Sequence, residues 1–175
     1  LKRRPWVFEL RDLWPESIFT VGAMKKNKAI KAFERIEHFM YRSADMIIPV
    51  TNAFKEHLIG RGIQESKINV ITNGVDSEKF LPIEKNRALL EKLNLKDKFI
   101  IGYIGTHGMA HSLDFIINCL PEVSDPSIHF LFVGDGAAKK EAQQSAKELQ
   151  LSNVTFMPPV SKNEVSDYVG ISDAV

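Results

Sequence analysis

The chain has 175 residues, 44% of them hydrophobic and 26% charged, which is ordinary globular composition and room for one domain or two small ones. The formal net charge of +1 gives no reason to expect a nucleic-acid partner. The single cysteine, Cys119, excludes an internal disulfide and fits a reducing compartment. We expect Cys119 to be a small core residue of a helix.

Apolar runs alternate with helical patterns along the whole chain. The apolar runs predict strands at 6–10, 46–50, 68–72, 99–104, 128–133 and 154–157, and one more beginning at Val175. Helical spacing predicts helices at about 28–43, 52–61, 85–93, 113–120, 137–149 and 164–169. This alternation predicts an α/β fold with parallel strands and right-handed crossovers.

The segment from Phe99 to Leu113 joins a buried strand to a helix through a glycine-rich loop. Gly105 and Gly108 allow a ligand to approach the main chain, and the helix N-terminus that follows favours an anion. We therefore predict that this loop receives the phosphates of a nucleotide. Its spacing matches neither the dinucleotide fingerprint nor the Walker motif. Two alternatives stay open: glycines used only for tight turns, and a nicotinamide site in which Asp135 holds a ribose.

Polar side chains in two strand-end loops are candidates for ligand contacts. His107 and His111 could offer an imidazole to a pyrophosphate or a sugar hydroxyl, or they are solvated loop histidines. They lack the further ligands that a metal site needs, so no metal is expected. After the first strand, Arg11 could meet an anionic group and Asp12 could orient a hydroxyl. The alternative for this pair is a local ion pair.

Basic residues gather in the first part of the chain, where residues 1–48 hold ten Lys and Arg against six Asp and Glu. Within 24–35 they stand beside the apolar Met24, Ile30 and Phe33 and are Lys25, Lys26, Lys28, Lys31 and Arg35. A solvated basic helix face is one interpretation. The other is peripheral contact with anionic lipid headgroups.

Seven motifs in order resemble the family 4 retaining glycosyltransferases of the two-Rossmann-domain (GT-B) class. They are Arg-Asp-Leu-Trp-Pro-Glu-Ser at 11–17, Ser-Ala-Asp at 43–45, Ile-x-Asn-Gly-Val-Asp at 71–76, Ile-Gly-Tyr-Ile-Gly-Thr-His-Gly-Met-Ala-His at 101–111, Val-Gly-Asp-Gly at 133–136, Asn-Val-x-Phe at 153–156 and Ser-Asp-Ala-Val at 172–175. The forms at 11–17 and 105–111 resemble bacterial enzymes that build capsule, colanic-acid or O-antigen sugars, often from N-acetylated amino-sugar donors.

The resemblance implies parts of two Rossmann-like domains: residues 1–76 on the acceptor side, a linker at 77–97, and residues 98–175 on the nucleotide-sugar donor side. It implies retaining transfer to a glycan or lipid-linked acceptor, without metal or cofactor, from a nucleotide sugar that we expect to be a UDP-sugar. Arg11 and Asp12 would face the sugar and acceptor, and Asn73 and Gly74 would lie at the hinge. The donor would contact Gly105, Thr106, His107, Gly108, His111, Asp135, Gly136, Pro159 and Val160.

Two departures from the family pattern affect this reading. Thr106 stands where many members have Arg, and His111 stands near a Lys position, so the loop carries less positive charge. The chain starts at Leu1, and the Glu-x7-Glu donor segment and the N-terminal glycine loop are not in it. We therefore expect an internal piece that is inactive alone and that comes from a cytoplasmic protein, peripheral on the inner membrane face. A UDP-sugar epimerase of the same fold and a noncatalytic nucleotide-binding module are the alternative functions.

Overall fold

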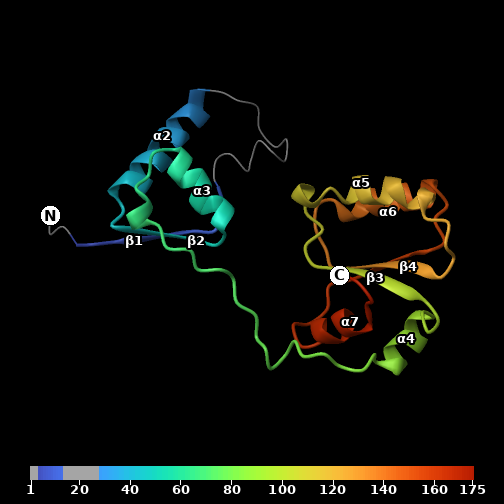
Figure 1. Cartoon of the computed structure of the whole chain (residues 1–175). Coiled ribbons are helices and arrows are strands. Elements are labelled where there is room, and N and C mark those ends of the chain that lie inside the picture. Colours follow the sequence, from blue (N-terminus) through green and yellow to red (C-terminus); the bar gives the residue numbers. More distant parts are fainter. Residues whose placement is uncertain (1–3, 14–27) are drawn as a thin grey trace. The chain divides into compact units, whose positions relative to one another are not determined.

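The computed structural model describes residues 4–13 and 28–175 and divides the chain into two compact units, Leu1–Val75 and Asp76–Val175. Figure 1 shows both units, each with helices packed on parallel strands. The α/β class predicted from the sequence is confirmed. Trp14 to Ser17 and the basic residues Lys25 and Lys26 lie outside the described residues.

The first unit is built on two parallel strands with helices on one face. Its elements are β1 (Val7–Leu10), α2 (Lys28–Ser43), β2 (Met46–Pro49) and α3 (Asn52–Gly60), followed by the short 3-10 helix η1 (Glu65–Lys67). Apolar residues from both strands and both helices, among them Leu10, Tyr41, Ile47 and Leu58, form its core. The side chain of Thr51 caps α3 by accepting a hydrogen bond from the backbone N–H of Phe54.

The predicted third strand at 68–72 does not form as a strand. Ile68 makes an isolated parallel bridge to Ile47, and the backbone N–H groups of Asn69 and Ile71 donate to the carbonyls of Ile47 and Pro49. Ile68 is buried but Ile71 is 60% exposed, so only the start of this run gains the burial that holds a strand in a sheet.

The second unit is a three-stranded parallel sheet between two layers of helices. Its strands are β3 (Phe99–Ile104), β4 (Ile128–Val133) and β5 (Val154–Met157), in the order β3-β4-β5, and Ala174 bridges to Ile101 on β3. Its helices are α4 (Arg87–Leu93), α5 (Leu113–Cys119), α6 (Lys139–Glu148) and α7 (Val165–Ile171), with 3-10 helices η2 (Met109–His111) and η3 (Leu120–Glu122). In Figure 1, α5 and α6 cover one face of the sheet, and α4 and α7 cover the other.

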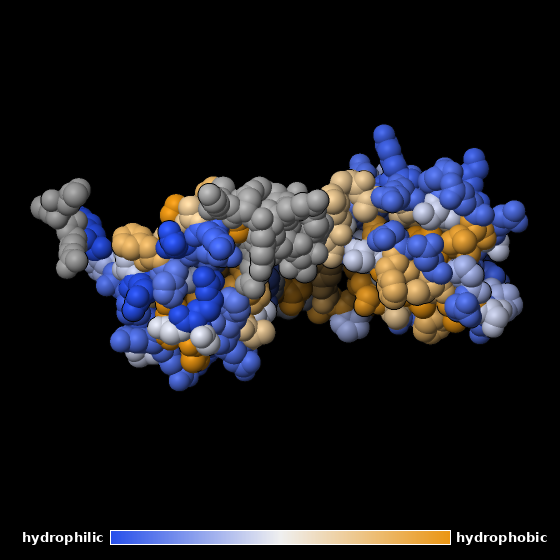
Figure 2. All heavy atoms as spheres, turned by 90° about the horizontal axis from the view of Figure 1, so that it is seen from above, coloured by the Kyte–Doolittle hydropathy of each residue, from blue (hydrophilic) through white to orange (hydrophobic). Residues whose placement is uncertain are grey.

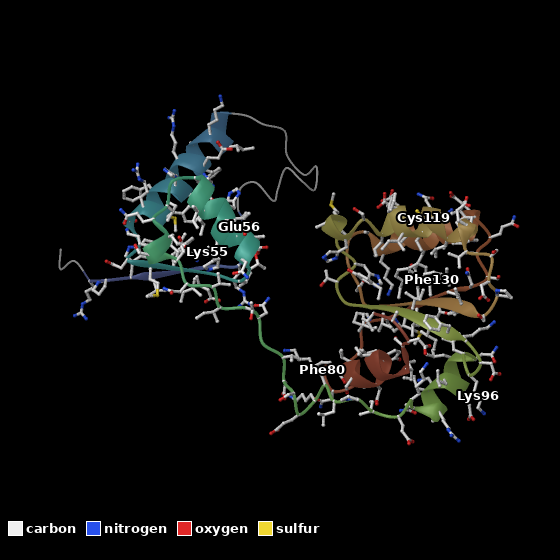
Figure 3. The ribbon with its side chains drawn as sticks, in the orientation of Figure 1. Lys55, Glu56, Phe80, Lys96, Cys119 and Phe130 are labelled. Carbon is white, nitrogen blue, oxygen red and sulfur yellow. The ribbon has the colours of Figure 1, made fainter. Side chains whose placement is uncertain are left out.

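Side chains along β4 alternate between the two faces of the sheet and so contribute to the apolar core on each face. Leu131 and Val133 pack toward α4 and α7, whereas Phe130 and Phe132 pack toward α5 and α6. Figure 3 shows Phe130 between the sheet and the α5–α6 layer. A strand that buries both faces reads as a continuous apolar run, which is why its bounds could be predicted from sequence.

Two other expectations about the second unit have structural outcomes. Cys119 is exposed, so its predicted place in the core is wrong: Leu113, Ile117 and Leu120 occupy the buried side of α5 and its continuation, and Cys119 lies off that stripe. The stretch 77–97, predicted as a linker, contains α4, whose Leu90 lies in the core of this unit.

On the α5–α6 side, hydrophilic and hydrophobic residues are interspersed at the surface (Figure 2).

Candidate functional site

An open pocket of about 500 Å³ lies at the carboxyl ends of the three strands of the second unit. Its walls come from the ends of β3 and β4, the loops after β3, β4 and β5, and the start of α7: Ile104, Gly105, Thr106, Val133, Gly134, Asp135, Pro159, Val160, Lys162 and Val165. Five of these residues, Gly105, Thr106, Asp135, Pro159 and Val160, were predicted from the sequence as donor contacts. Ligands of open parallel sheets bind at this edge.

Two glycines bring the loops after β3 and β4 into backbone contact. Gly134 has φ +148° and Gly136 has φ +156°, a region that side chains avoid. A Cβ on Gly134 would collide with the carbonyl oxygen of Gly105, and one on Gly136 would collide with the backbone of His107. A Cβ on Gly105 itself would meet no atom within 4 Å, so this residue faces open space. The loop glycines therefore set the wall of the pocket and leave it accessible.

Hydrogen bonds join the same two loops. The backbone N–H of His107 donates to the carbonyl of Asp135 at 2.8 Å, and the N–H of Ala138 donates to the carbonyl of His107 at 2.9 Å. The carboxylate of Asp135 accepts from the N–H of Gly136 at 2.8 Å. These bonds fix Asp135 relative to the β3 loop.

The side chain of His107 is buried and does not line the pocket. Its ring lies 5.6 Å from Tyr103, 6.4 Å from Phe132 and 6.5 Å from Phe156, measured between ring centroids. Among the residues that the structure describes, neither ring nitrogen has a hydrogen-bond partner. Burial lowers the pKa of His107, and the charge of Lys139 adds to this effect. His107 is thus neither a solvated loop histidine nor a group that faces the pocket.

His111 is exposed and is tied to the β3 loop. Its Nδ1 lies 2.6 Å from the carbonyl oxygen of Thr106 and 2.8 Å from the hydroxyl of Tyr103. A carbonyl oxygen only accepts, so the bond to Thr106 requires a hydrogen on Nδ1 and leaves Nε2 as the second polar atom of the ring. His111, like Gly108 and Gly136, is not among the residues that line the pocket.

Two lysines that the sequence analysis did not single out lie at this site. Lys162 follows β5 and lines the pocket. The ammonium of Lys139, the first residue of α6, donates to the carbonyls of Gly134 at 2.6 Å and Met157 at 2.8 Å. In the sequence each stands in a polar stretch and looks like a surface lysine. The sequence signal that could have identified Lys139 is its position just after the glycine turn that follows β4.

In the first unit, Arg11 and Asn73 lie together at the end of β1. The Arg11 guanidinium donates from Nη2 to Asn73 Oδ1 at 3.0 Å and lies 3.4 Å from Glu9 Oε1. All three residues, with Gly74, line an open pocket of about 530 Å³. The predicted catalytic arginine is thus bonded to a predicted hinge residue. Asp12 is exposed, and the ion pair of Arg11 is with Glu9, where a pair with Asp12 was the alternative considered.

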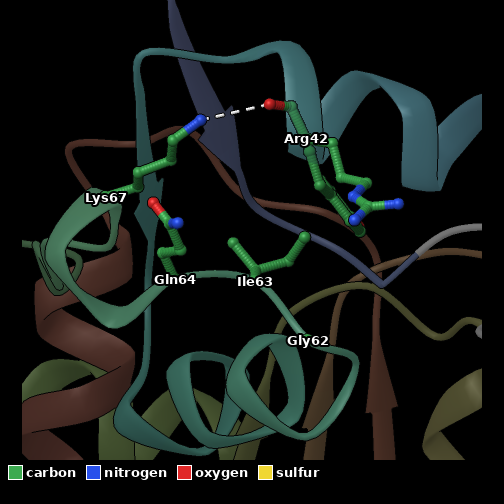
Figure 4. Close-up of a pocket in the computed structure, with 6 residues that line it drawn as sticks. Arg42, Gly62, Ile63, Gln64 and Lys67 are labelled. Carbon is green, nitrogen blue, oxygen red and sulfur yellow. Dashed lines mark hydrogen bonds between the residues drawn. The ribbon is translucent and has the colours of Figure 1, made fainter.

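A smaller pocket of about 150 Å³ in the first unit is lined by Tyr41, Arg42, Gly62, Ile63, Gln64 and Lys67 (Figure 4). The Lys67 ammonium points to the end of α2 and donates to the carbonyls of Arg42 at 3.1 Å and Ala44 at 2.9 Å. Its donors therefore satisfy helix C-terminal carbonyls, and this pocket has a structural explanation.

Within residues 4–13 and 28–175, no group of three His, Cys, Asp or Glu is arranged to hold a metal ion. A search of the same residues finds no helix with the length and apolar character that crossing a membrane requires.

Comparison with known proteins places both halves of the chain. Residues 1–79 match the model of Glycosyltransferase Family 4, and residues 85–175 match that of Glycosyl transferases group 1. The chain is 25% identical, over 164 residues, to the probable glycosyltransferase WbjE of Pseudomonas aeruginosa, covering 90% of this chain and 41% of that protein.

Solved structures share the fold. The Anabaena protein Alr3699/HepE, crystallised with UDP and glucose, has a TM-score of 0.76 at 19% identity, covering 97% of this chain and 45% of that one. WaaG, a glycosyltransferase involved in lipopolysaccharide biosynthesis, has a TM-score of 0.70 at 15% identity, covering 97% of this chain and 49% of that one. The chain spans less than half the length of each of these relatives. It belongs to the family 4 glycosyltransferases of the GT-B fold, with its residues 85–175 in the glycosyl transferases group 1 family.

Proposed function

We propose that the intact protein transfers a sugar, of the N-acetylated hexosamine type, from a UDP-sugar to a glycan or lipid-linked acceptor in bacterial surface polysaccharide biosynthesis. The observation that carries this proposal is the open pocket at the carboxyl ends of β3, β4 and β5. Support comes from the UDP complexes of Alr3699/HepE and from the lipopolysaccharide role of WaaG.

The pocket residues divide by their chemistry. Gly105 and Thr106 offer backbone groups and a hydroxyl to the diphosphate, and Pro159 and Val160 offer an apolar border for the base. Asp135 offers a carboxylate that can accept hydrogen bonds from sugar hydroxyls. Transfer proceeds with retention and needs no metal or cofactor, because hydrogen bonds to the leaving diphosphate carry its developing charge.

The two units take different parts in this proposal. Residues 98–175 belong to the donor domain and residues 1–76 to the acceptor domain, where Arg11 and Asp12 act on the sugar and the acceptor. Asn73 and Gly74 belong to the hinge. The hydrogen bond from Arg11 to Asn73 supports a link between the hinge and the reacting sugar.

Calorimetric titration of the intact protein with UDP tests the donor site. Gly105→Val should weaken UDP binding at least about tenfold, because the added side chain enters the pocket while its Cβ meets no atom in the fold. Gly60→Val is the matched control: its Cβ also meets no atom within 4 Å, and it ends α3 in the other unit. Equal UDP affinity of the two variants would contradict the proposed site.

Measuring the consumption of the UDP-sugar with and without an acceptor distinguishes the three candidate functions. Loss of UDP-sugar only when a glycan or lipid-linked acceptor is added supports transfer. Conversion of the sugar without any acceptor indicates an epimerase. Binding of UDP without either reaction indicates a noncatalytic nucleotide-binding module.

The proposal includes peripheral contact with an anionic membrane through residues 24–35, of which the structure describes 28–35, the start of α2. Ile30 is buried there and Phe33 is 42% exposed, so the exposed apolar surface continues along α2 beyond the predicted segment. Lys31 and Arg35 are exposed on this helix, and Ile36 and Phe39 are 55% and 69% exposed. Basic residues beside exposed apolar ones are the pattern of an interfacial helix. The proposal therefore includes a position at the cytoplasmic face of the membrane.

A further inference from the structure

Strands β4 and β5 separate at the edge of the sheet where the pocket lies. Their ladder ends with the pair Val133 and Met157, and the next backbone bond, from Gly134 N–H to the Met157 carbonyl, is long at 3.4 Å. Lys139 reaches this point from the first turn of α6. Its ammonium donates to the carbonyls of both residues, Gly134 and Met157. A positive charge therefore lies between the loops that form two walls of the pocket.

One acidic residue, Asp135, lies in the loop that Lys139 contacts and lines the same pocket, but it is not ion-paired with Lys139. In the described part of the chain no carboxylate forms an ion pair with Lys139, and Glu141, the acidic residue of the same helical turn, is exposed. A lysine at the N-terminus of a helix also opposes the helix dipole. Two of the three ammonium hydrogens bind carbonyl oxygens, which leaves one donor. Such an arrangement is favourable when an anion binds nearby.

The β3 loop needs positive charge from elsewhere. Residues 99–113 contain no lysine or arginine, and Lys162 is the cationic side chain that the described pocket lining includes. A nucleoside diphosphate brings a strongly negative group to this edge. We propose that Lys139 supplies positive charge to the diphosphate of the bound nucleotide, from the ends of β4 and β5. The proposal rests on the donor site proposed above.

The test compares the affinities of the intact protein for UDP and for uridine, which lacks the phosphates. Lys139→Gln removes the charge and keeps N–H donors for the two carbonyls. It should weaken UDP binding about tenfold, the loss of one charge-assisted hydrogen bond, and change uridine binding less than about twofold. Lys139→Arg, which keeps the charge, should retain most of the UDP affinity. Lys140→Gln is the matched control, since Lys140 is the exposed neighbour on the same helix.

Two results would overturn the inference: UDP affinity of Lys139→Gln equal to that of the wild type, or an equal loss of UDP and uridine affinity, which indicates a purely structural lysine. Thermal unfolding of each variant shows whether it folds. The wild type gives a second measurement, because equal affinity for UDP and uridine at low salt would also exclude a charge contribution. If the wild type binds neither UDP nor uridine, the proposed donor site itself is wrong. This outcome is distinguishable from the results that contradict only the role of Lys139.

Discussion

The ring of His107 is a buried polar group without a hydrogen-bond partner among the described residues, held by Tyr103, Phe132 and Phe156. Burying a polar atom without a partner costs free energy, so the surroundings favour an apolar ring here. His107→Phe should raise the free energy of unfolding by about 1 kcal/mol near neutral pH. Chemical denaturation of both proteins measures the difference. A large destabilisation would show that the imidazole has a partner that the packing does not reveal.

Stability should also depend on pH through this residue. The pKa of His107 in the folded chain is lowered, first by burial and then by Lys139, so the unfolded chain binds its proton at a higher pH. The stability that the neutral imidazole contributes is complete above about pH 6.5, the ordinary pKa of histidine, and is lost as the pH falls toward the pKa of the folded chain. Wild type should therefore lose more stability than His107→Phe between about pH 7.5 and pH 5.5. His129, whose pKa burial also lowers, is present in both proteins, so the difference isolates His107.

The role of His107 could not be read from the sequence, because its burial depends on aromatic residues of β4 and β5. The same holds for Lys139, whose partners meet only when the ends of those strands come together. Gly105 and Asp135 could be predicted, since a residue directly after a parallel strand lies at the ligand-binding edge wherever the helices fall.

Among the elements, β4 and β5 have the bounds that their apolar runs predicted, Ile128–Val133 and Val154–Met157. Helix α2 also has its predicted bounds, Lys28–Ser43, but its apolar residues are divided between two faces: Ile30 and Tyr41 are buried, whereas Phe33, Ile36 and Phe39 are exposed. The run at 68–72 has the same composition as a strand but buries only its first residue. Apolar content predicts a strand only where neighbouring elements provide a surface to cover it.

Helix α2 has a membrane prediction of its own. Lys31→Glu combined with Arg35→Glu should reduce co-sedimentation of the intact protein with vesicles containing phosphatidylglycerol several-fold at about 0.1 M salt, because these exposed residues attract anionic headgroups. Lys140→Glu combined with Lys147→Glu makes the same change of charge on exposed positions of α6 and should leave sedimentation unchanged. If both pairs of substitutions reduce sedimentation equally, the effect comes from net charge alone, and α2 is not the membrane-binding surface.

At the scale of the whole molecule, each unit has its own core. The first is closed by residues from β1, β2, α2 and α3, and the second by two apolar layers on either side of β4. The family resemblance assigned the motifs at 11–17 and 101–111 to different domains, and the strands next to them, β1 and β3, belong to separate sheets. The boundary of the second unit was harder to place. Helix α4 carries apolar residues at helical spacing in a charged stretch, and only its packing assigns it to that unit.

The stretch between the cores gives the last prediction. Residues 71–85 are all exposed and lie outside any helix or strand. Trypsin should therefore cut the intact protein at Lys79, whose side chain is 64% exposed, before it cuts at Lys92 inside α4. Mass spectrometry over a time course identifies the order, and the two products should persist because each retains its core. In Lys79→Gln the cut should disappear while other cleavage sites keep their rates. Early cleavage at Lys92, with Lys79 intact, would mean that the stretch is protected and that the units do not separate there.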